Sequence, residues 1–441
     1  MKSVRLRLVV LALAPLVVLT PVLLLLGMTR WTADYDAVLI ANVESDLRIA
    51  EQFLSQLVAD TGDDLAATAN ATEFDTALRG AAAARARYFD AKRQALGLDF
   101  LYYLPEDVAL RTAARWPVVE DGLNGVPAAA IDVFGAADLA DLSPELAARA
   151  RIDLIPTDAA RPSDRTVEER GMVVHAAAPV AVPGHAGVLV GGILLNRNLQ
   201  FIDRVNALVY RNALTGGTRQ GTATLFLDDV RISTNVRLFE DVRALGTRVS
   251  EVVWAAVLRR GQTWLDRAFV VNDWYISGYL PLRDSFGERV GMLYVGFLEA
   301  PFTAAKRDAY LVMLAAFAAV LALSVPVFLW LARGVFAPLE RMTQTMARVR
   351  GGDLDARIGG TGGRDEIAQV ADAFDDLLDK LSERDARLRA WTVELNREVE
   401  ARTADLSAAN AELEKTYRQL AMTEKLAAIG EITAGVAHEI N

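Results

Sequence analysis

A histidine followed by a glutamate near the carboxyl end of the sequence is the pair best suited to chemistry. His438 and Glu439 lie in the stretch EKLAAIGEITAGVAHEIN, residues 424–441. A neutral imidazole nitrogen is a nucleophile at physiological pH, and a neighbouring carboxylate can hold the proton on the other ring nitrogen as the ring becomes cationic. The pair could therefore accept a group onto nitrogen.

The same stretch predicts an amphipathic helix with His438 on its exposed side. Its buried face recurs at three- and four-residue steps and comprises Leu426, Ile429, Thr433, Val436 and Ile440. At about 100° per residue, His438 lies about 200° around the helix from both Val436 and Ile440, so its ring projects into solvent. Geometry alone also allows an inert surface histidine.

A second set of residues, in the first half of the sequence, has the composition of a small-molecule site. It comprises Arg111, Arg115, His175 and the aromatic residues Tyr102, Tyr103 and Trp116. A guanidinium beside aromatic rings is a good receiver for a carboxylate. The alternative interpretation is a solvated arginine at a strand edge and a structural histidine. His175 and His185 have no obvious further ligands around them, so no metal site is predicted.

Composition limits the kinds of molecule this can be. A chain of 441 residues exceeds one hydrophobic core and predicts several modules. Its net charge of -10 argues against nucleic acid as a partner, because phosphate binding requires a basic surface. The sequence has no cysteine, which excludes disulfides, thiolate metal sites and a cysteine nucleophile.

Two long apolar stretches predict transmembrane helices at residues 8–28 and 309–332. The first is longer than the apolar part of a signal peptide and lacks a clear cleavage site, which disfavours that alternative. Basic residues precede the first stretch and follow the second: Lys2, Arg5 and Arg7 before, and Arg333, Arg341, Arg348 and Arg350 after. The positive-inside rule therefore places residues 1–7 and everything after the second stretch in the cytoplasm. Residues 30–307 then lie on the opposite, non-cytoplasmic side of the lipid bilayer.

The region between the predicted spans contains an internal repeat. VVHAAAPVAVPGHAGVLVGGILL from Val173 aligns with YISGYLPLRDSFGERVGMLYVGFL from Tyr275. The matched pairs are Pro179 with Pro281, Gly187 with Gly291, and Gly192 with Gly296. Upstream, LDFLYYLPEDVALRTAAR and TATLFLDDVRISTNVR each predict a strand, a tight acidic turn and a returning strand. Each copy should form an α+β module of about five antiparallel strands with helices on one side.

A long helix should precede the first copy. From about Trp31, apolar residues recur at helical spacing: Leu39, Val43, Leu47, Ala50, Leu54 and Leu57. With the repeat, this arrangement resembles a double Cache (PAS-like) sensor region, divided at residues 30–215 (membrane-distal) and 216–307 (membrane-proximal). The resemblance implies that a small-molecule ligand binds outside the membrane, usually in the distal copy, and does not identify that ligand.

Residues 333–386 resemble a HAMP linker. Pro338-Leu339-Glu340 matches the start of the family's first helix, Gly352-Asp353-Leu354 matches its connector, and Asp365-Glu366 matches the start of its second helix. The resemblance implies an all-α segment that passes a signal across the membrane towards the carboxyl end of the sequence.

An apolar heptad begins at Ile367 and predicts a coiled coil, which occupies residues 387–423 after the linker. The a positions are Ala371, Leu378, Asp385, Thr392, Val399, Leu406, Leu413 and Leu420. The d positions are Ile367, Phe374, Leu381, Leu388, Leu395, Arg402, Ala409 and Thr416. No domain nearby could receive such a long amphipathic helix, so a parallel homodimer is the favoured interpretation.

Residues 424–441 resemble the H-box of sensor histidine kinases, at the start of the dimerisation and phosphotransfer domain. The resemblance implies a bacterial inner-membrane protein with protein-histidine kinase activity, in which His438 is the phosphoacceptor and Glu439 its acid/base neighbour. It further implies ATP and Mg²⁺ in a kinase domain and a response regulator receiver domain as partner. This sequence binds no cofactor of its own and should be inactive alone, as a kinase truncated just after the H-box. A Cache–HAMP chemoreceptor and a non-catalytic ligand-binding membrane protein are the alternatives.

Overall fold

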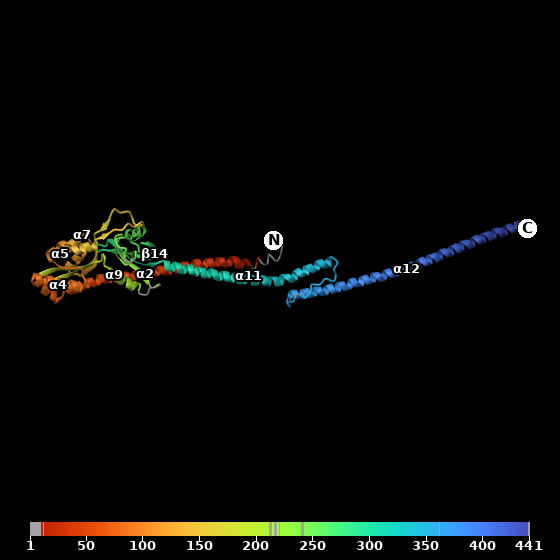
Figure 1. Cartoon of the computed structure of the whole chain (residues 1–441), viewed down its shortest axis with the longest axis horizontal. Coiled ribbons are helices and arrows are strands. Elements are labelled where there is room, and N and C mark those ends of the chain that lie inside the picture. Colours follow the sequence, from red (N-terminus) through yellow and green to blue (C-terminus); the bar gives the residue numbers. More distant parts are fainter. Residues whose placement is uncertain are drawn as a thin grey trace. The chain divides into compact units, whose positions relative to one another are not determined.

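The computed structural model describes residues 10–11, 13–210, 214–215, 218–219, 221–239, 242–360 and 362–439 (Figure 1). The predicted cytoplasmic segment 1–7 lies outside these residues. The chain divides into two compact units, Val22–Leu314 and Met1–Pro21 with Ala315–Asn441.

Two of the described helices are long and apolar enough to cross a membrane. They run over Pro15–Ala69, which combines the π-helix η1 (Pro15–Leu19) with α2 (Thr20–Ala69), and over Ala300–Arg350, which is α11. The first span and the predicted helix from Trp31 are thus one continuous helix. No glycine or proline interrupts the residues between Met28 and Trp31, so the helix has no reason to end there.

The predicted buried face of α2 is confirmed. Leu39, Val43, Leu47, Ala50 and Leu54 are all buried, and Leu57 packs against the same core cluster. Because these residues return every three or four positions, they form one continuous stripe along the helix.

The first sheet has four antiparallel strands in the order β1-β6-β5-β2. Its strands are β1 (Phe100–Pro105), β2 (Ala128–Phe134), β5 (Gly171–Val182) and β6 (His185–Leu194). One face packs on α2, α3 (Thr72–Arg79) and α4 (Ala82–Ala95). The other face packs on α5 (Glu106–Ala113), α6 (Pro117–Leu123), α7 (Ala136–Leu142) and α8 (Pro144–Ala150).

The prediction for this copy was therefore wrong in two respects. Helices cover both faces, and the residues expected to form a returning strand after Pro105 form helix α5. Glu106 and Asp107 lie in the first turn of that helix, where negative charges interact favourably with the positive end of the helix dipole. Ala109 of the same helix is buried in the core. An acidic pair after a strand signals a helix start as well as a hairpin turn.

The second sheet has five antiparallel strands, as predicted, in the order β10-β9-β15-β14-β13. They are β9 (Gly221–Leu227), β10 (Val230–Thr234), β13 (Trp264–Val270), β14 (Asp273–Arg283) and β15 (Arg289–Leu298). One face packs on α2 and α9 (Leu199–Val209). The opposite face packs on residues 236–258, which include α10 (Glu251–Trp254) and the π-helix η2 (Ala255–Arg259).

Five two-residue strands and one three-residue strand complete the described part of this unit. They are β3 (Ile152–Asp153), β4 (Val167–Glu168), β7 (Leu214–Thr215), β8 (Thr218–Arg219), β11 (Arg237–Phe239) and β12 (Val242–Arg243), of which β11 is the longer. They pair as β3 with β4, β7 with β8, and β11 with β12.

The positions aligned as a repeat occupy the same register in the two central hairpins. Val180 pairs with Gly187 and Leu282 with Gly291, one residue beyond the aligned prolines. A Cβ on Gly187 would lie 2.1 Å from the carbonyl oxygen of Leu104, and a Cβ on Gly291 would lie 2.1 Å from that of Phe226. Glycine is required at both places because a neighbouring strand approaches too closely for any side chain.

In the second unit, the end of α11 and the start of α12 (Glu366–Glu439) share a small core of Met342, Ile358, Ala371 and Phe374. The Asp375 carboxylate accepts backbone N–H groups of Ile358 at 2.8 Å and Gly359 at 2.9 Å, which fixes the connector. Pro338 lies inside α11, so the first helix of the linker continues the span without a new start.

Helix α12 has 74 residues, and its apolar heptad is exposed beyond the small core. Leu388, Leu395, Leu406, Leu413 and Leu420 each expose 57–65% of their surface. The backbone of His438 and Glu439 lies within this helix, and side chains from Val436 onward are outside the described residues.

Candidate ligand-binding site

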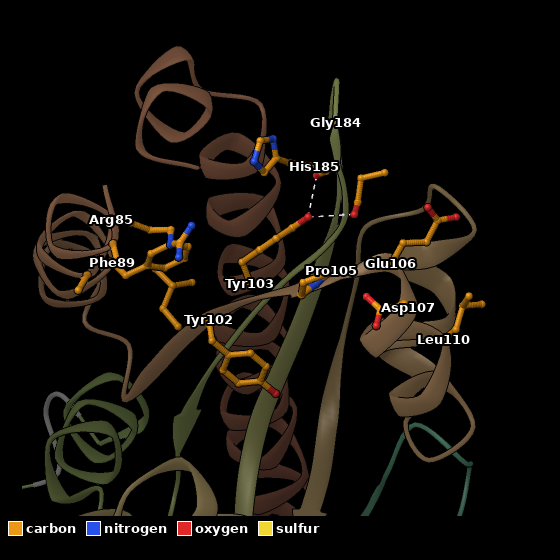
Figure 2. Close-up of a pocket in the computed structure, with 14 residues that line it drawn as sticks. Arg85, Phe89, Tyr102, Tyr103, Pro105, Glu106, Asp107, Leu110, Gly184 and His185 are labelled. Atoms are coloured by element: carbon orange, nitrogen blue, oxygen red, sulfur yellow. Dashed lines mark hydrogen bonds between the residues drawn. The ribbon is translucent and has the colours of Figure 1, made fainter. Parts of the chain in front are cut away.

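An open cleft of about 1080 Å³ lies beside the edge strand β1 of the first sheet (Figure 2). Figure 2 shows Arg85 and Phe89 of α4 on one side, and Glu106, Asp107 and Leu110 of α5 on the other. The turn that joins β5 to β6, with Gly184 and His185, closes the end. The cleft exists because β1 has a partner strand on one side only.

Tyr103 is the residue that ties this cleft together. Its hydroxyl donates to the backbone carbonyl oxygens of His185 at 2.8 Å and Ala186 at 2.9 Å, drawn as dashed lines in Figure 2. Burial raises the pKa of Tyr103, and the charges of Asp107 and Glu106 raise it further. The phenol therefore stays protonated and holds the turn against the strand.

The charged groups of the cleft suit a polar ligand. Arg85 makes no ion pair with any described residue, whereas Asp107 pairs with Arg111 at 3.3 Å. The Nδ1 atom of His185 is buried and has no hydrogen-bond partner among the described residues. The cleft thus offers a free cation for an anionic group and Glu106 and Asp107 for a cationic one.

Of the predicted site residues, the structure places only Tyr102 and Tyr103 in this cleft. Arg111 lies on α5 and is exposed, where its partner is Asp107 one turn earlier. Arg115 binds Asp138 at 2.6 Å, and that carboxylate also accepts the backbone N–H of Gly135. Neither arginine lies on a strand, contrary to the prediction, because Arg111 lies in α5 and Arg115 in the turn between α5 and α6.

Trp116 and His175 are brought together, but in the core. Their rings meet edge to face at 5.5 Å, and His175 is 1% exposed. The His175 Nδ1 atom lies 2.8 Å from the carboxylate of Asp132, which also accepts the Ser285 hydroxyl at 2.6 Å. Because Ser285 follows β14 of the second sheet, this buried group joins the two sheets. Such contacts suit the structural interpretation of His175.

The sequence did not predict a ligand-binding role for four residues that line the cleft: Arg85, Phe89, Leu110 and His185. The sequence feature that could have indicated this cleft is the Gly184-His185 turn together with the aromatic residues of the edge strand β1. The arginine on α4 could not be found this way, because the approach of α4 to β1 depends on tertiary packing.

Residues 193–309 match the family described as Single cache domain 3, and residues 330–383 match the HAMP domain. The first match begins within β6 and spans the whole second sheet. The chain carries a Cache sensor domain followed by a HAMP domain. With the apolar helices on either side of the Cache domain, these features fit a two-pass membrane protein that transduces signals.

Two solved structures similar to this chain are a periplasmic domain and a ligand-binding domain. The periplasmic domain of LuxQ from Vibrio cholerae is 14% identical, with a TM-score of 0.34, and the match covers 58% of this chain and 99% of that one. The ligand-binding domain of the amino acid chemoreceptor PctB from Pseudomonas aeruginosa, in complex with L-Arg, is 14% identical, with a TM-score of 0.28, and the match covers 62% and 92% of the two chains. No curated protein matches the sequence.

Proposed function

We propose that the chain is the sensory and phosphoacceptor part of a transmembrane sensor histidine kinase. The observation that carries the proposal is the single helix α12, which begins in the HAMP domain and runs to Glu439. A change in HAMP packing would reach His438 along one rigid element, without an intervening domain. The sensor region lies outside the bacterial inner membrane, and both ends of the chain lie in the cytoplasm.

The two sheets are proposed to be tandem Cache modules. The shared hairpin register and the two matching close-approach glycines support this, although the first sheet differs in strand number and helix placement. Small-molecule binding outside the membrane is the input of the sensor.

The functional form is proposed to be a parallel homodimer. Five heptad leucines of α12 are more than half exposed in the single chain, and an apolar seam of this length is stable in water when a second helix covers it. Cysteines introduced at Leu406 or Leu413 should crosslink to the same position in the second copy. Stronger crosslinking from Glu412, outside the seam, would contradict the register.

The proposed chemistry at His438 is transfer of the γ-phosphoryl group of ATP. A ring nitrogen forms a P–N bond while the bond from the γ-phosphorus to the bridging oxygen breaks, and ADP leaves with Mg²⁺. Glu439 holds the proton on the other nitrogen as the ring becomes cationic. The phosphoryl group then passes to an aspartate of a response regulator.

The test is phosphoryl labelling with the ATP-binding domain of a related kinase supplied as a fusion. We expect acid-labile, base-stable label that His438→Gln abolishes. Glu439→Ala should slow labelling by about 10²–10⁴-fold, the usual value of general-base assistance, whereas Glu431→Ala on the same helix should not. Label that persists in His438→Gln would end the assignment, since His175 and His185 lie in the sensor region.

A further inference from the structure

A second cavity, in the Cache domain, encloses a buried arginine without a counter-ion. The cavity has a volume of about 250 Å³ and is bounded by β10, β13, β14 and residues 155–159. Arg231 of β10 lines it and is 3% exposed. A buried guanidinium is costly unless it is paired, so its surroundings decide what it can bind.

The protein satisfies only part of this guanidinium. Nη1 donates to the Thr247 hydroxyl at 2.8 Å, and the ring of Phe226 lies 5.1 Å from the central carbon. Nε is buried and has no acceptor, and Nη2 donates to no described residue. The Nε–Nη2 edge, which presents two parallel N–H groups, therefore has no acceptor.

The nearby acids are committed elsewhere. Asp229, which is fully buried, accepts from Arg165 at 2.9 Å, from Arg161 at 3.4 Å and from Arg248. Asp228 is held by Arg161 at 2.9 Å and by the indole N–H of Trp254 at 2.8 Å. Asp158 also lines the cavity, but it is exposed and makes no ion pair with Arg231 among the described residues.

The tyrosines around Arg231 do not neutralise it either. Burial raises the pKa of Tyr294 to about 12 and raises that of Tyr279 further, so both are neutral hydroxyls. Burial also lowers the pKa of Arg231, because the charged form loses water. The interior of the cavity thus carries one uncompensated positive charge.

We infer that this cavity binds a small organic monocarboxylate, with its carboxylate on Arg231 and its apolar part against Leu238, Val249 and Phe269. One cation calls for one negative charge, and the apolar lining calls for a hydrocarbon tail. The volume lies just below the range of ordinary ligand pockets, which limits the tail to a few carbons or one ring. Inorganic phosphate lacks such a tail and would bring excess charge.

Residues 155–159 give the site a route to the rest of the sensor. They come from the part of the chain that connects β3 to β4, between strands of the first sheet, and Arg161 and Arg165 fasten this segment to the Asp228–Asp229 turn. A ligand on Arg231 would thus contact the second sheet and a loop that lies, in sequence, between β2 and β5 of the first sheet. The inference rests on the proposed function only in treating residues 30–307 as a ligand-sensing region.

The test uses the full chain in lipid nanodiscs, with butyrate and benzoate as probes and their amides as uncharged controls. We expect saturable binding of the carboxylates, one per chain, with a rise in melting temperature, and no effect of butyramide or benzamide. Arg231→Met should weaken binding by about tenfold or more, because a charge-assisted hydrogen bond is lost. The ligand-free Arg231→Met protein should melt no lower than the parent, since an unpaired buried charge is removed.

A second variant guards against misfolding of the first. Ala159 is exposed at the wall of the cavity, so Ala159→Trp should block binding without disturbing the core. Arg85→Met, in the cleft by β1, is the matched control and should bind as the parent does. Binding that survives Arg231→Met or is lost in Arg85→Met would overturn the inference, as would equal binding of the amides or of phosphate, or no carboxylate binding. His438 labelling is measured separately, so either proposal can fail alone.

Discussion

The two sheets of the sensor region share a hairpin register and differ in how they handle charge. Around the first sheet, two basic side chains each face an acid: buried His175 lies against Asp132, and the partly exposed Arg149 pairs with Asp99. In the second, Asp229 has three arginine partners while Arg231, two residues along, has no acid. The larger cavity lies beside the first sheet, but the uncompensated buried charge lies in the smaller one. Charge balance therefore separates the two candidate sites better than volume does.

The largest loss of stability should come from removing Asp229, the buried acid that pairs with three arginines. Asp229→Ala leaves three arginines without their shared partner, and breaking a buried pair in this way costs about 3–5 kcal/mol. Asp107→Ala, which breaks the exposed pair with Arg111, should cost less than about 1 kcal/mol. Chemical unfolding of the sensor region in the full chain measures both. Equal losses would show that burial does not distinguish the two ion pairs.

A smaller and more even effect is expected at the paired glycines. Gly187→Ala and Gly291→Ala each push a Cβ against a neighbouring strand's carbonyl oxygen, and such overpacking costs about 1–3 kcal/mol. Gly430→Ala on α12, where nothing lies within 4 Å of the added carbon, is the control. Thermal unfolding gives the total effect, and hydrogen exchange shows which hairpin loosens. A loss at only one glycine would mean that the shared register does not reflect shared packing.

Sequence alone predicted the elements whose patterns are local. The stripe of α2 follows from helical spacing, and the second sheet follows from alternating strands with an Asp-Asp turn between β9 and β10. The predicted strand after Pro105 was wrong, because the same acidic residues are typical of a hairpin turn and of the start of a helix. The HAMP segment was found because its proline, glycine and acidic positions follow a span directly.

The candidate sites were harder to predict from the sequence, for a physical reason. In β10, Val230 and Ile232 face the core shared with α2, so alternation places Arg231 on the other face. Whether that face is solvent or cavity depends on residues 155–159 and 236–258, which cover it from elsewhere in the chain. The pattern of one strand cannot contain that information. Arg111 and Arg115, which were predicted to bind the ligand, instead pair with Asp107 and Asp138. These acids lie on α5 and α7, two helices that the sequence patterns did not predict.

The smallest expected effect concerns Asp46, which lies on α2 where that helix passes the second sheet. Burial raises the pKa of Asp46 to about 6, from an unfolded value near 4. Between those values the folded state binds more protons than the unfolded state, so stability falls as the pH rises through this window. Asp46→Asn should therefore raise the free energy of unfolding at pH 7.5 by less than about 1 kcal/mol after screening by solvent, with a small rise in melting temperature, and should have no effect below pH 4. Asp63→Asn, an exposed position on the same helix, is the control. An Asp46→Asn effect that is independent of pH would show that folding does not raise the pKa of this carboxylate.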